Sequence, residues 1–192
     1  SFHAFSLDAT VFENKGEYYW IWAEKTGVGK QISNLYIAKM EAPDKLATVQ
    51  VLLTTPDYGW ERIDFWGNEG PAILKHNGKI YLTFSASATG ACYCMGMMCA
   101  DEDADLLDPQ SWKKWNLPVL KTDEAKGLYG PGHNSFVKAE DGETDLCIYH
   151  ARPYDEIIGD PLYDPNRHAM IMKVEYREDG TPVFDYKNNI QF

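Results

Sequence analysis

The sequence predicts an all-β protein built from small antiparallel sheets, because one layout of strands and turns occurs three times along its 192 residues. In each copy an apolar strand leads into a polar turn that contains glycine, and a second strand rich in β-branched and aromatic residues follows. The three copies are residues 9–24, 71–87 and 134–152. Their turn glycines, Gly16, Gly78 and Gly142, lie 62 and 64 residues apart. No long amphipathic helix pattern interrupts this series.

Two of the turns carry residue pairs that close tight hairpins, Asn77-Gly78 and Asp141-Gly142. We expect type I′ turns there, because both central residues of that turn have positive φ. A third strand follows each hairpin, in residues 33–41, 93–102 and 168–179. One turn of helix is expected within residues 103–115, where Asp-Pro and Ser are cap-like.

A repeat of about 60 residues made of small sheets is typical of a β-propeller. Closed propellers have at least about four blades, so three copies predict part of a larger ring. The approximate blades are residues 1–62, 63–127 and 128–192, which together form one partial propeller domain. The chain does not begin with methionine. We therefore expect N-terminal blades supplied by the same chain or by another.

The composition argues against two classes of partner. The 18 Lys and Arg residues against 29 Asp and Glu residues give a net charge of −11. Because this balance repels polyanions, we expect no nucleic acid partner and no anionic membrane surface. No apolar run reaches the ~18 residues that span a bilayer. The aromatic share of 14% suits both a β-sheet core and stacking against sugar rings.

The four cysteines do not match a zinc-binding pattern, which requires two separated Cys pairs. Three of them lie within residues 92–99, and Cys147 is the only other one. We interpret them as small apolar residues of buried strands.

Two carboxylates open successive hairpins: Asp8 in SLDATVF and Glu69 in NEGPAIL. His133, in GPGHNSF, lies near the same place in the third copy. In a propeller the innermost strand of each blade begins beside the central channel, so these three side chains are expected to converge. The alternative is that each carboxylate is a turn residue or a solvated strand end, and that His133 is a hydrogen-bonded core residue.

Two carboxyl groups at one cavity suit cleavage of a glycosidic bond, because one donates a proton to the leaving oxygen and the other assists or activates water. An acid that works near neutral pH needs a raised pKa, which burial and a nearby negative charge both provide. Phe65 and Trp66, close to Glu69 in sequence, offer a sugar platform and a low dielectric.

At SLDATVFE, NEGPAIL and GPGHNSF the sequence resembles glycoside hydrolase family 43. The resemblance implies a five-bladed β-propeller that cleaves arabinose- or xylose-containing polymers with inversion. The stretch YHARPYDEIIGDPLYDPNRHAMI is similar to the arabinofuranosidase-type branch of that family.

The resemblance implies a role for several positions. Glu69 matches the general acid, and Asp8 matches the aspartate that orients it and sets its pKa. His133 matches the histidine that helps to hold a calcium or other cation through water, and no organic cofactor is implied. The residues expected to bind substrate are Trp66, Phe65, Asn68, Arg152 and Arg167. The alternative for Arg152 is that it pairs with a carboxylate.

The sequence departs from the family pattern at the general base, an aspartate upstream of Leu-Asp-Ala-Thr. Residues 1–7 contain no carboxylate side chain, so we expect the base to lie outside this chain. The predicted function is an inverting hydrolase that releases L-arabinofuranose from plant cell-wall arabinan or arabinoxylan. A β-xylosidase on the same scaffold and a non-catalytic carbohydrate-binding propeller are the alternatives. Such a substrate suits a secreted or periplasmic protein, but no leader is visible, so an intracellular location stays open.

Overall fold

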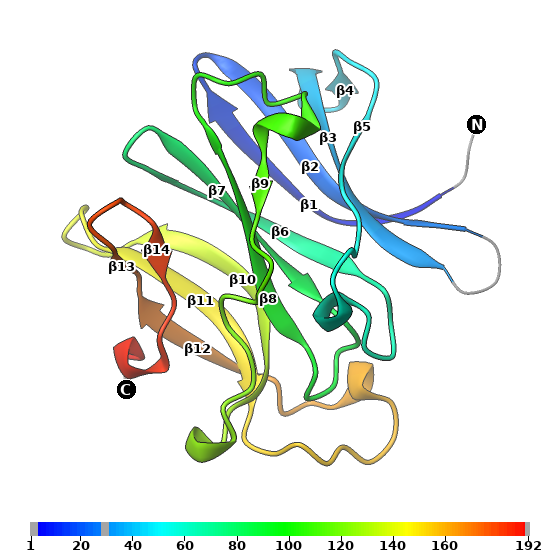
Figure 1. Ribbon diagram of the computed structural model, residues 1–192, viewed down its shortest axis with the longest axis vertical. Helices are drawn as coiled ribbons and strands as arrows, with labels where there is room; N and C mark the ends of the chain where they lie inside the picture. Colours follow the sequence, from blue (N-terminus) through cyan, green and yellow to red (C-terminus); the bar gives the residue numbers. More distant parts are fainter. Residues whose placement is uncertain (1–3, 28–30, 191–192) are drawn as a thin grey trace.

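A computed structural model describes residues 4–27 and 31–190, and within those ranges the regular elements are β-strands and short 3-10 helices (Figure 1). The prediction of an all-β fold is confirmed. Among the described residues no helix has the length and apolar character needed to cross a membrane. The strands form three successive antiparallel sheets and one short two-stranded ribbon.

The first sheet has five strands, in the order β1-β2-β3-β4, with β5 also paired to β3. Its elements are β1 (Phe5–Asn14), β2 (Glu17–Thr26), β3 (Ile32–Ala42), β4 (Lys45–Leu46) and β5 (Val51–Thr54). The 3-10 helix η1 (Gly59–Glu61) follows and leads to the second sheet.

The second sheet has four strands in sequence order: β6 (Asn68–His76), β7 (Lys79–Ala86), β8 (Cys94–Asp101) and β9 (Lys113–Lys114). The 3-10 helix η2 (Pro109–Ser111) lies between its last two strands, with the Asp108 side chain accepting a hydrogen bond from the Gln110 backbone. This single turn is the helical turn expected within residues 103–115.

The third sheet has three strands, also in sequence order. Its elements and those that follow are η3 (Glu124–Lys126), β10 (Tyr129–Lys138), β11 (Asp145–Arg152), η4 (Pro161–Tyr163), β12 (His168–Lys173), β13 (Glu175–Tyr176), β14 (Pro182–Val183) and η5 (Tyr186–Asn188). The strand expected over residues 168–179 is therefore divided, since β12 pairs with β11 and β13 pairs with β14.

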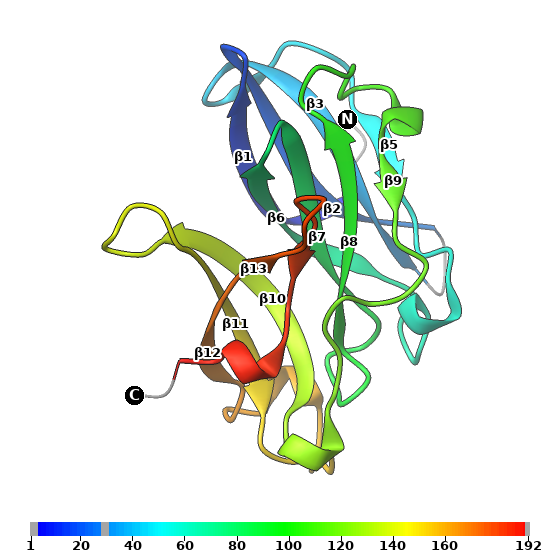
Figure 2. The same ribbon diagram turned by 60° about the vertical axis from the view of Figure 1, so that its left-hand side comes forward.

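The first strands of the three sheets lie side by side at the centre of the molecule. Strand β6 contacts both β1 and β10, and the remaining strands of each sheet extend outward from this centre (Figures 1 and 2). This is the radial arrangement of propeller blades, in which innermost strands surround a shared axis. Residues far apart in the sequence therefore come together where these three strands begin.

Apolar cores lie on both faces of the second sheet, because residues of β7 alternate between them. Ile80, Leu82 and Phe84 pack in one core with residues of the first sheet. Tyr81 packs in the other with residues of the third sheet, including Tyr149. The second sheet is thus held between its neighbours.

The hairpin turns agree only in part with the expectation. Asn77 and Gly78 both have positive φ, 48° and 70°, as a type I′ turn requires. The hairpin predicted at Asp141-Gly142 is present, since β10 pairs with β11. Its turn is not type I′, because Gly142 but not Asp141 has positive φ and six residues separate the two strands. There the Asp141 carboxylate accepts hydrogen bonds from the backbones of residues 143 and 144, which stabilises a longer loop.

All four cysteines are free thiols, and Cys94 and Cys147 are buried in the cores. Burial raises the pKa of each of these two thiols to about 12, which keeps them protonated. Among the described residues, the one group of potential metal ligands contains no cysteine.

Candidate active site

Each central strand carries a β-bulge at the same place in its sheet. On β1 the register shifts between Leu7 and Thr10, so two residues oppose Trp22. Equivalent shifts place residues 70 and 71 opposite Phe84, and residues 133 and 134 opposite Tyr149. A bulge bends the strand and re-aims its side chains, and such bulges occur often beside active sites.

The first residue of each bulge has a left-handed backbone. The φ angles are 53° at Asp8, 55° at Gly70 and 49° at His133. Asp8 and His133 therefore hold equivalent positions, whereas Glu69 lies one residue before the equivalent position in the second sheet. Left-handed conformations are uncommon for residues other than glycine, and they are often found at functional sites.

The structure brings Asp8, Glu69 and His133 together into one cluster. One carboxylate or imidazole atom of each lies within 4.8 Å of the others. Asp8 Oδ1 is 3.9 Å from His133 Nε2, and Asp8 Oδ2 accepts a hydrogen bond of 3.1 Å from the Gly70 backbone. Two carboxylates and one imidazole from three sheets thus share one small volume.

Gly70 permits this close approach. A Cβ atom at this position would lie 3.2 Å from His133 Nδ1 and 3.4 Å from two further ring atoms. The positive φ of Gly70 would also strain any other residue. The glycine of the Glu-Gly-Pro motif therefore lets the imidazole pack over the backbone beside Glu69.

The surroundings of Glu69 favour its protonated form. Burial raises the pKa of this carboxyl group, and the negative charge of Asp8 acts in the same direction. A hydrogen bond of 2.9 Å from the Tyr93 hydroxyl to Glu69 Oε1 opposes the rise in pKa, as do His133 and Lys25. The net effect is a raised pKa, which suits a group that must carry a proton near neutral pH.

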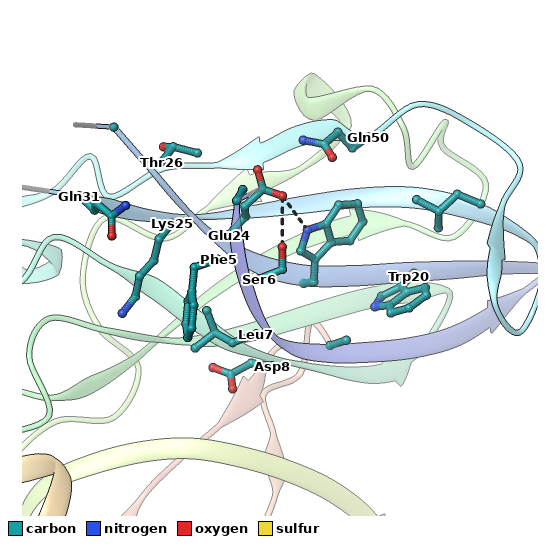
Figure 3. Close-up of a pocket in the computed structure, with 15 residues that line it drawn as sticks. Phe5, Ser6, Leu7, Asp8, Trp20, Glu24, Lys25, Thr26, Gln31 and Gln50 are labelled. Atoms are coloured by element: carbon teal, nitrogen blue, oxygen red, sulfur yellow. Dashed lines mark hydrogen bonds between the residues drawn. The ribbon is translucent and has the colours of Figure 1, made fainter. Parts of the chain in front are cut away.

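Two members of the cluster, Asp8 and His133, line a cavity of about 640 Å³ formed by β1, β6 and β10, together with Gly70. The side chain of His133 is 48% exposed. A second depression, of about 950 Å³, lies over the first sheet (Figure 3). Asp8 borders both, whereas Glu69 is among the lining residues of neither.

Phe65 and Trp66 lie in the loop that leads into β6. The Lys25 ammonium lies 5.2 Å from the centre of the Phe65 ring, and Lys25 also influences the pKa of Glu69. Trp66 is 38% exposed, and the Arg62 guanidinium carbon lies 4.7 Å from its ring centre. Each ring therefore makes a cation–π contact just before the start of β6.

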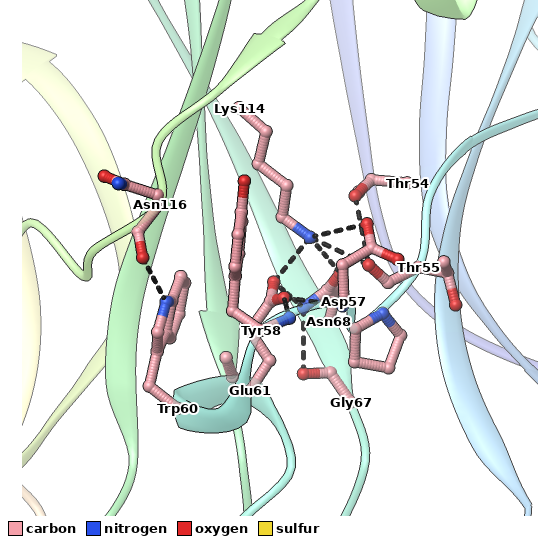
Figure 4. Close-up of polar contacts among 12 residues, drawn as sticks. Thr54, Thr55, Asp57, Tyr58, Trp60, Glu61, Gly67, Asn68, Lys114 and Asn116 are labelled. Carbon is pink, nitrogen blue, oxygen red and sulfur yellow. Dashed lines mark hydrogen bonds and ion pairs between the residues drawn. The ribbon is translucent and has the colours of Figure 1, made fainter.

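Asn68 faces away from the cluster, which corrects the expectation that it contacts substrate. It is fully buried, and its amide donates hydrogen bonds to Glu61 Oε1 at 2.9 Å and to the Gly67 carbonyl (Figure 4). The Lys114 ammonium donates to its Oδ1 at 3.4 Å. Neighbouring residues of a strand point to opposite faces, so Asn68 anchors the strand while Glu69 faces the cluster.

Arg152 is also buried and lies beside a carboxylate, which agrees with the alternative role expected for it and not with direct contact with a sugar. Its Nη1 and Nη2 donate to the carbonyl oxygens of Thr89 and Pro161 at 2.6 and 2.7 Å. Its Nε lies 3.5 Å from Asp164. Arg167 is half-buried, and its Nη2 donates to the Leu162 carbonyl at 3.4 Å. Arg152 thus ties residues 161–164 to the loop between β7 and β8.

Three residues of the site were missed in the sequence: Lys25, Ser85 and Tyr93. Lys25 lies at the end of β2, and Ser85 accepts a 2.6 Å hydrogen bond from the His133 backbone N–H. Tyr93 lies within the cysteine-rich stretch that reads as a buried strand. The signal available for Ser85 was its position in the second hairpin, opposite Glu69.

Comparisons with known proteins identify the family of the chain. The family model described as Glycosyl hydrolases family 43 matches residues 1–182. The extracellular exo-α-(1→5)-L-arabinofuranosidase of Streptomyces avermitilis is 48% identical over 181 residues, which cover 94% of this chain and 38% of that protein. The α-L-arabinofuranosidase 43 of Humicola insolens is 45% identical over 181 residues, with the same coverage of both chains, 94% and 38%.

A solved structure gives the same result for the fold. The crystal structure of the α-L-arabinofuranosidase from Lactobacillus brevis superposes with a TM-score of 0.91 at 53% identity. The match covers 94% of this chain and 56% of that one. The chain therefore spans well under two thirds of the length of these relatives. With its matched motifs and its radial sheets, the chain belongs to glycosyl hydrolases family 43 and forms part of that family's five-bladed β-propeller.

Proposed function

We propose that this chain is part of an exo-acting, inverting α-L-arabinofuranosidase that releases L-arabinofuranose from plant cell-wall arabinan or arabinoxylan, with Glu69 as the general acid. The observation that carries this proposal is the raised pKa of Glu69 beside Asp8 at the junction of three sheets. The names of the relatives, which are 45 and 48% identical, support arabinofuranose as the sugar.

Glu69 would protonate the glycosidic oxygen as the bond to the anomeric carbon breaks. Departure of an alkoxide from a sugar is slow in water, and a positioned acid accelerates such steps by roughly 10²–10⁴-fold. The raised pKa of Glu69 favours its protonated form in comparison with a free glutamic acid side chain.

Asp8 is too close to Glu69 to be its partner base. In inverting enzymes the acid and the base lie about 6.5–9.5 Å apart, which leaves room for the attacking water. Here the two carboxylates come within 4.8 Å. We infer that Asp8 orients Glu69 and raises its pKa, and that the base that activates water is a carboxylate outside these 192 residues.

His133 would hold a calcium or other cation through a bridging water at the floor of the cavity. The Asp8 carboxylate, which lies close to His133, supplies an oxygen ligand of the kind that calcium prefers. Glu69 is not proposed as a ligand, because it must carry a proton. Phe65, Trp66 and Arg167 are proposed to border the bound sugar. Because two of the matched relatives are named extracellular, we also propose that the protein is secreted.

The test uses the full-length protein and the variant Glu69→Gln. We expect turnover of linear arabino-oligosaccharides to fall by about 10²–10⁴-fold, with binding retained. A nitrophenyl arabinofuranoside should lose much less activity, because nitrophenolate leaves without protonation. Glu41→Gln, at an exposed glutamate, is the matched control and should behave as the wild type. Unchanged turnover of oligosaccharides by Glu69→Gln would overturn the assignment.

The same assay separates the alternatives. Preferred hydrolysis of the corresponding xyloside would indicate a β-xylosidase, and binding of oligosaccharides without turnover would indicate a binding propeller. Nuclear magnetic resonance of the first product reports its anomeric configuration, and retention would contradict the inverting mechanism.

A further inference from the structure

We propose that Tyr93 is a positioning residue for the acid, whose hydroxyl fixes Glu69 Oε1 as a hydrogen-bond acceptor and leaves Oε2 to carry the proton that is transferred. This inference rests on the proposed role of Glu69. Tyr93 comes from the segment just before β8, 24 residues beyond Glu69, and its hydroxyl lies 2.9 Å from Glu69 Oε1.

The hydrogen bond to Glu69 ends a short chain of donors. The His133 N–H donates a 2.6 Å hydrogen bond to Ser85 Oγ. Ser85 in turn hydrogen-bonds the Tyr93 hydroxyl. Since a serine oxygen can accept while its own proton donates, Ser85 can donate to Tyr93, which leaves the phenol proton for Glu69. The Tyr93 hydroxyl donates to Glu69 Oε1, so Oε1 is the acceptor at the end of the chain.

This hydrogen bond determines which oxygen of neutral Glu69 carries the proton. A neutral carboxyl group carries one proton on one oxygen, and an oxygen that accepts from Tyr93 disfavours that proton. The proton of neutral Glu69 therefore sits on Oε2. On transfer, the Oε2–H bond breaks and the proton joins the glycosidic oxygen, leaving a carboxylate whose Oε1 already has a hydrogen-bond donor.

Tyr93 is rigidly held, as a positioning residue must be. It is 1% exposed. A Cβ at residue 132 would lie 2.6 Å from Tyr93 Cε1, so only glycine fits beside this ring. The His150 ring stacks on Tyr93 with centres 5.5 Å apart and planes 11° from parallel. Burial lowers the pKa of His150 to about 4, with a contribution from Arg167, so the stacked ring is neutral at working pH.

The hydrogen bond from Tyr93 lowers the pKa of Glu69, whereas burial and the charge of Asp8 raise it. Burial and the Glu69 carboxylate hold the pKa of Tyr93 well above its usual range, so it remains a donor wherever Glu69 titrates. Four groups bear on the pKa of Glu69: Asp8 raises it, and Tyr93, His133 and Lys25 lower it. Removing the hydroxyl should therefore raise the pKa of Glu69 further.

The experiment compares Tyr93→Phe with the wild type in the full-length protein. We expect kcat on arabino-oligosaccharides to fall by about tenfold, a smaller loss on nitrophenyl arabinofuranoside, and a shift of the alkaline limb of the kcat/KM profile to higher pH. Ser85→Ala should shift the same limb in the same direction by less, because it removes the hydrogen bond that orients the phenol.

Tyr81→Phe is the matched control. Tyr81 is equally buried, and its hydroxyl donates to the Gly180 carbonyl at 3.0 Å, far from the cluster in the second core. It should change thermal stability without moving the pH profile. A Tyr93→Phe enzyme with wild-type kcat and pH profile, in a protein that Glu69→Gln inactivates, would overturn this inference alone. Activity that survives Glu69→Gln would instead remove the proposed function.

Discussion

Asp8 Oδ2 accepts a 3.1 Å hydrogen bond from the backbone N–H of Gly70, the residue that directly follows Glu69. This contact joins the first sheet to the second beside Glu69, the proposed acid. It means that Asp8 acts on Glu69 in two ways, by fixing the peptide that carries it and by placing a negative charge beside it. The two effects can be separated by mutation.

Asp8→Asn should remove the charge and keep an oxygen that accepts from Gly70. Because the charge of Asp8 raises the pKa of Glu69, its loss lowers that pKa. A general acid is active only while protonated, so the alkaline limb of the kcat/KM profile should move to lower pH. We expect a loss of roughly 10–100-fold above neutral pH. Asp8→Ala should lose more, and an unmoved limb in Asp8→Asn would contradict the electrostatic role.

Glu69→Gln should make the folded protein more stable at neutral pH. A carboxyl group whose pKa is higher in the folded state binds more protons there, so stability falls as pH rises from the unfolded value through the folded one. Glutamine removes this cost. The gain in melting temperature should be full above the folded pKa and vanish below about pH 4. Thermal unfolding from acid to neutral pH tests this, and a gain that persists in acid would refute it.

Gly70→Ala should impair both folding and activity. The added methyl would lie 3.2 Å from His133 Nδ1, in a backbone with φ of 55°, and we expect a loss of roughly 2 kcal/mol in the free energy of unfolding. Gly16→Ala is the matched comparison, with positive φ and open space around it, and should cost about 1 kcal/mol. Equal losses in denaturant titrations would show that the contact with His133 is unimportant.

Lys114→Met should destabilise the protein strongly, although it lies outside the cluster. The Lys114 ammonium is 2.6 Å from Oε1 of Glu61, which is fully buried (Figure 4). Removing one partner leaves an uncompensated buried charge, which costs about 3–5 kcal/mol. Lys45→Met, which breaks an exposed pair with Glu41, should have little effect. Chemical unfolding of both variants measures the difference.

The repeated layout of the sequence was sufficient for the fold and for the convergence of Asp8, Glu69 and His133. Glycine spacing and strand patterns define three hairpins, and propeller geometry then places their first residues at one axis. The side on which each side chain lies was not predictable, because a bulge changes the alternation of a strand. Asn68 was expected at the cavity, whereas it faces Glu61. It lies before the bulge, so its orientation follows from ordinary alternation with Glu69.

Contacts between residues of different sheets could not be predicted from the sequence either. Tyr93 belongs to a stretch whose cysteines and methionines indicate a core strand, and nothing local links it to Glu69. Arg152 ends a strand, where arginine is ordinarily exposed, but the loop over residues 161–164 covers it. Both cases depend on which segments meet in space.

The bulges have a further consequence. Two of the three bulges donate a backbone N–H to the adjacent sheet: that of Gly70 bonds Asp8, and that of His133 bonds Ser85. Residues of the cluster therefore also connect neighbouring blades. A substitution that shifts one sheet against its neighbour would also move the residues of the cluster and alter the proposed activity. We therefore expect substitutions to be tolerated best in the outer strands and least where the blades meet.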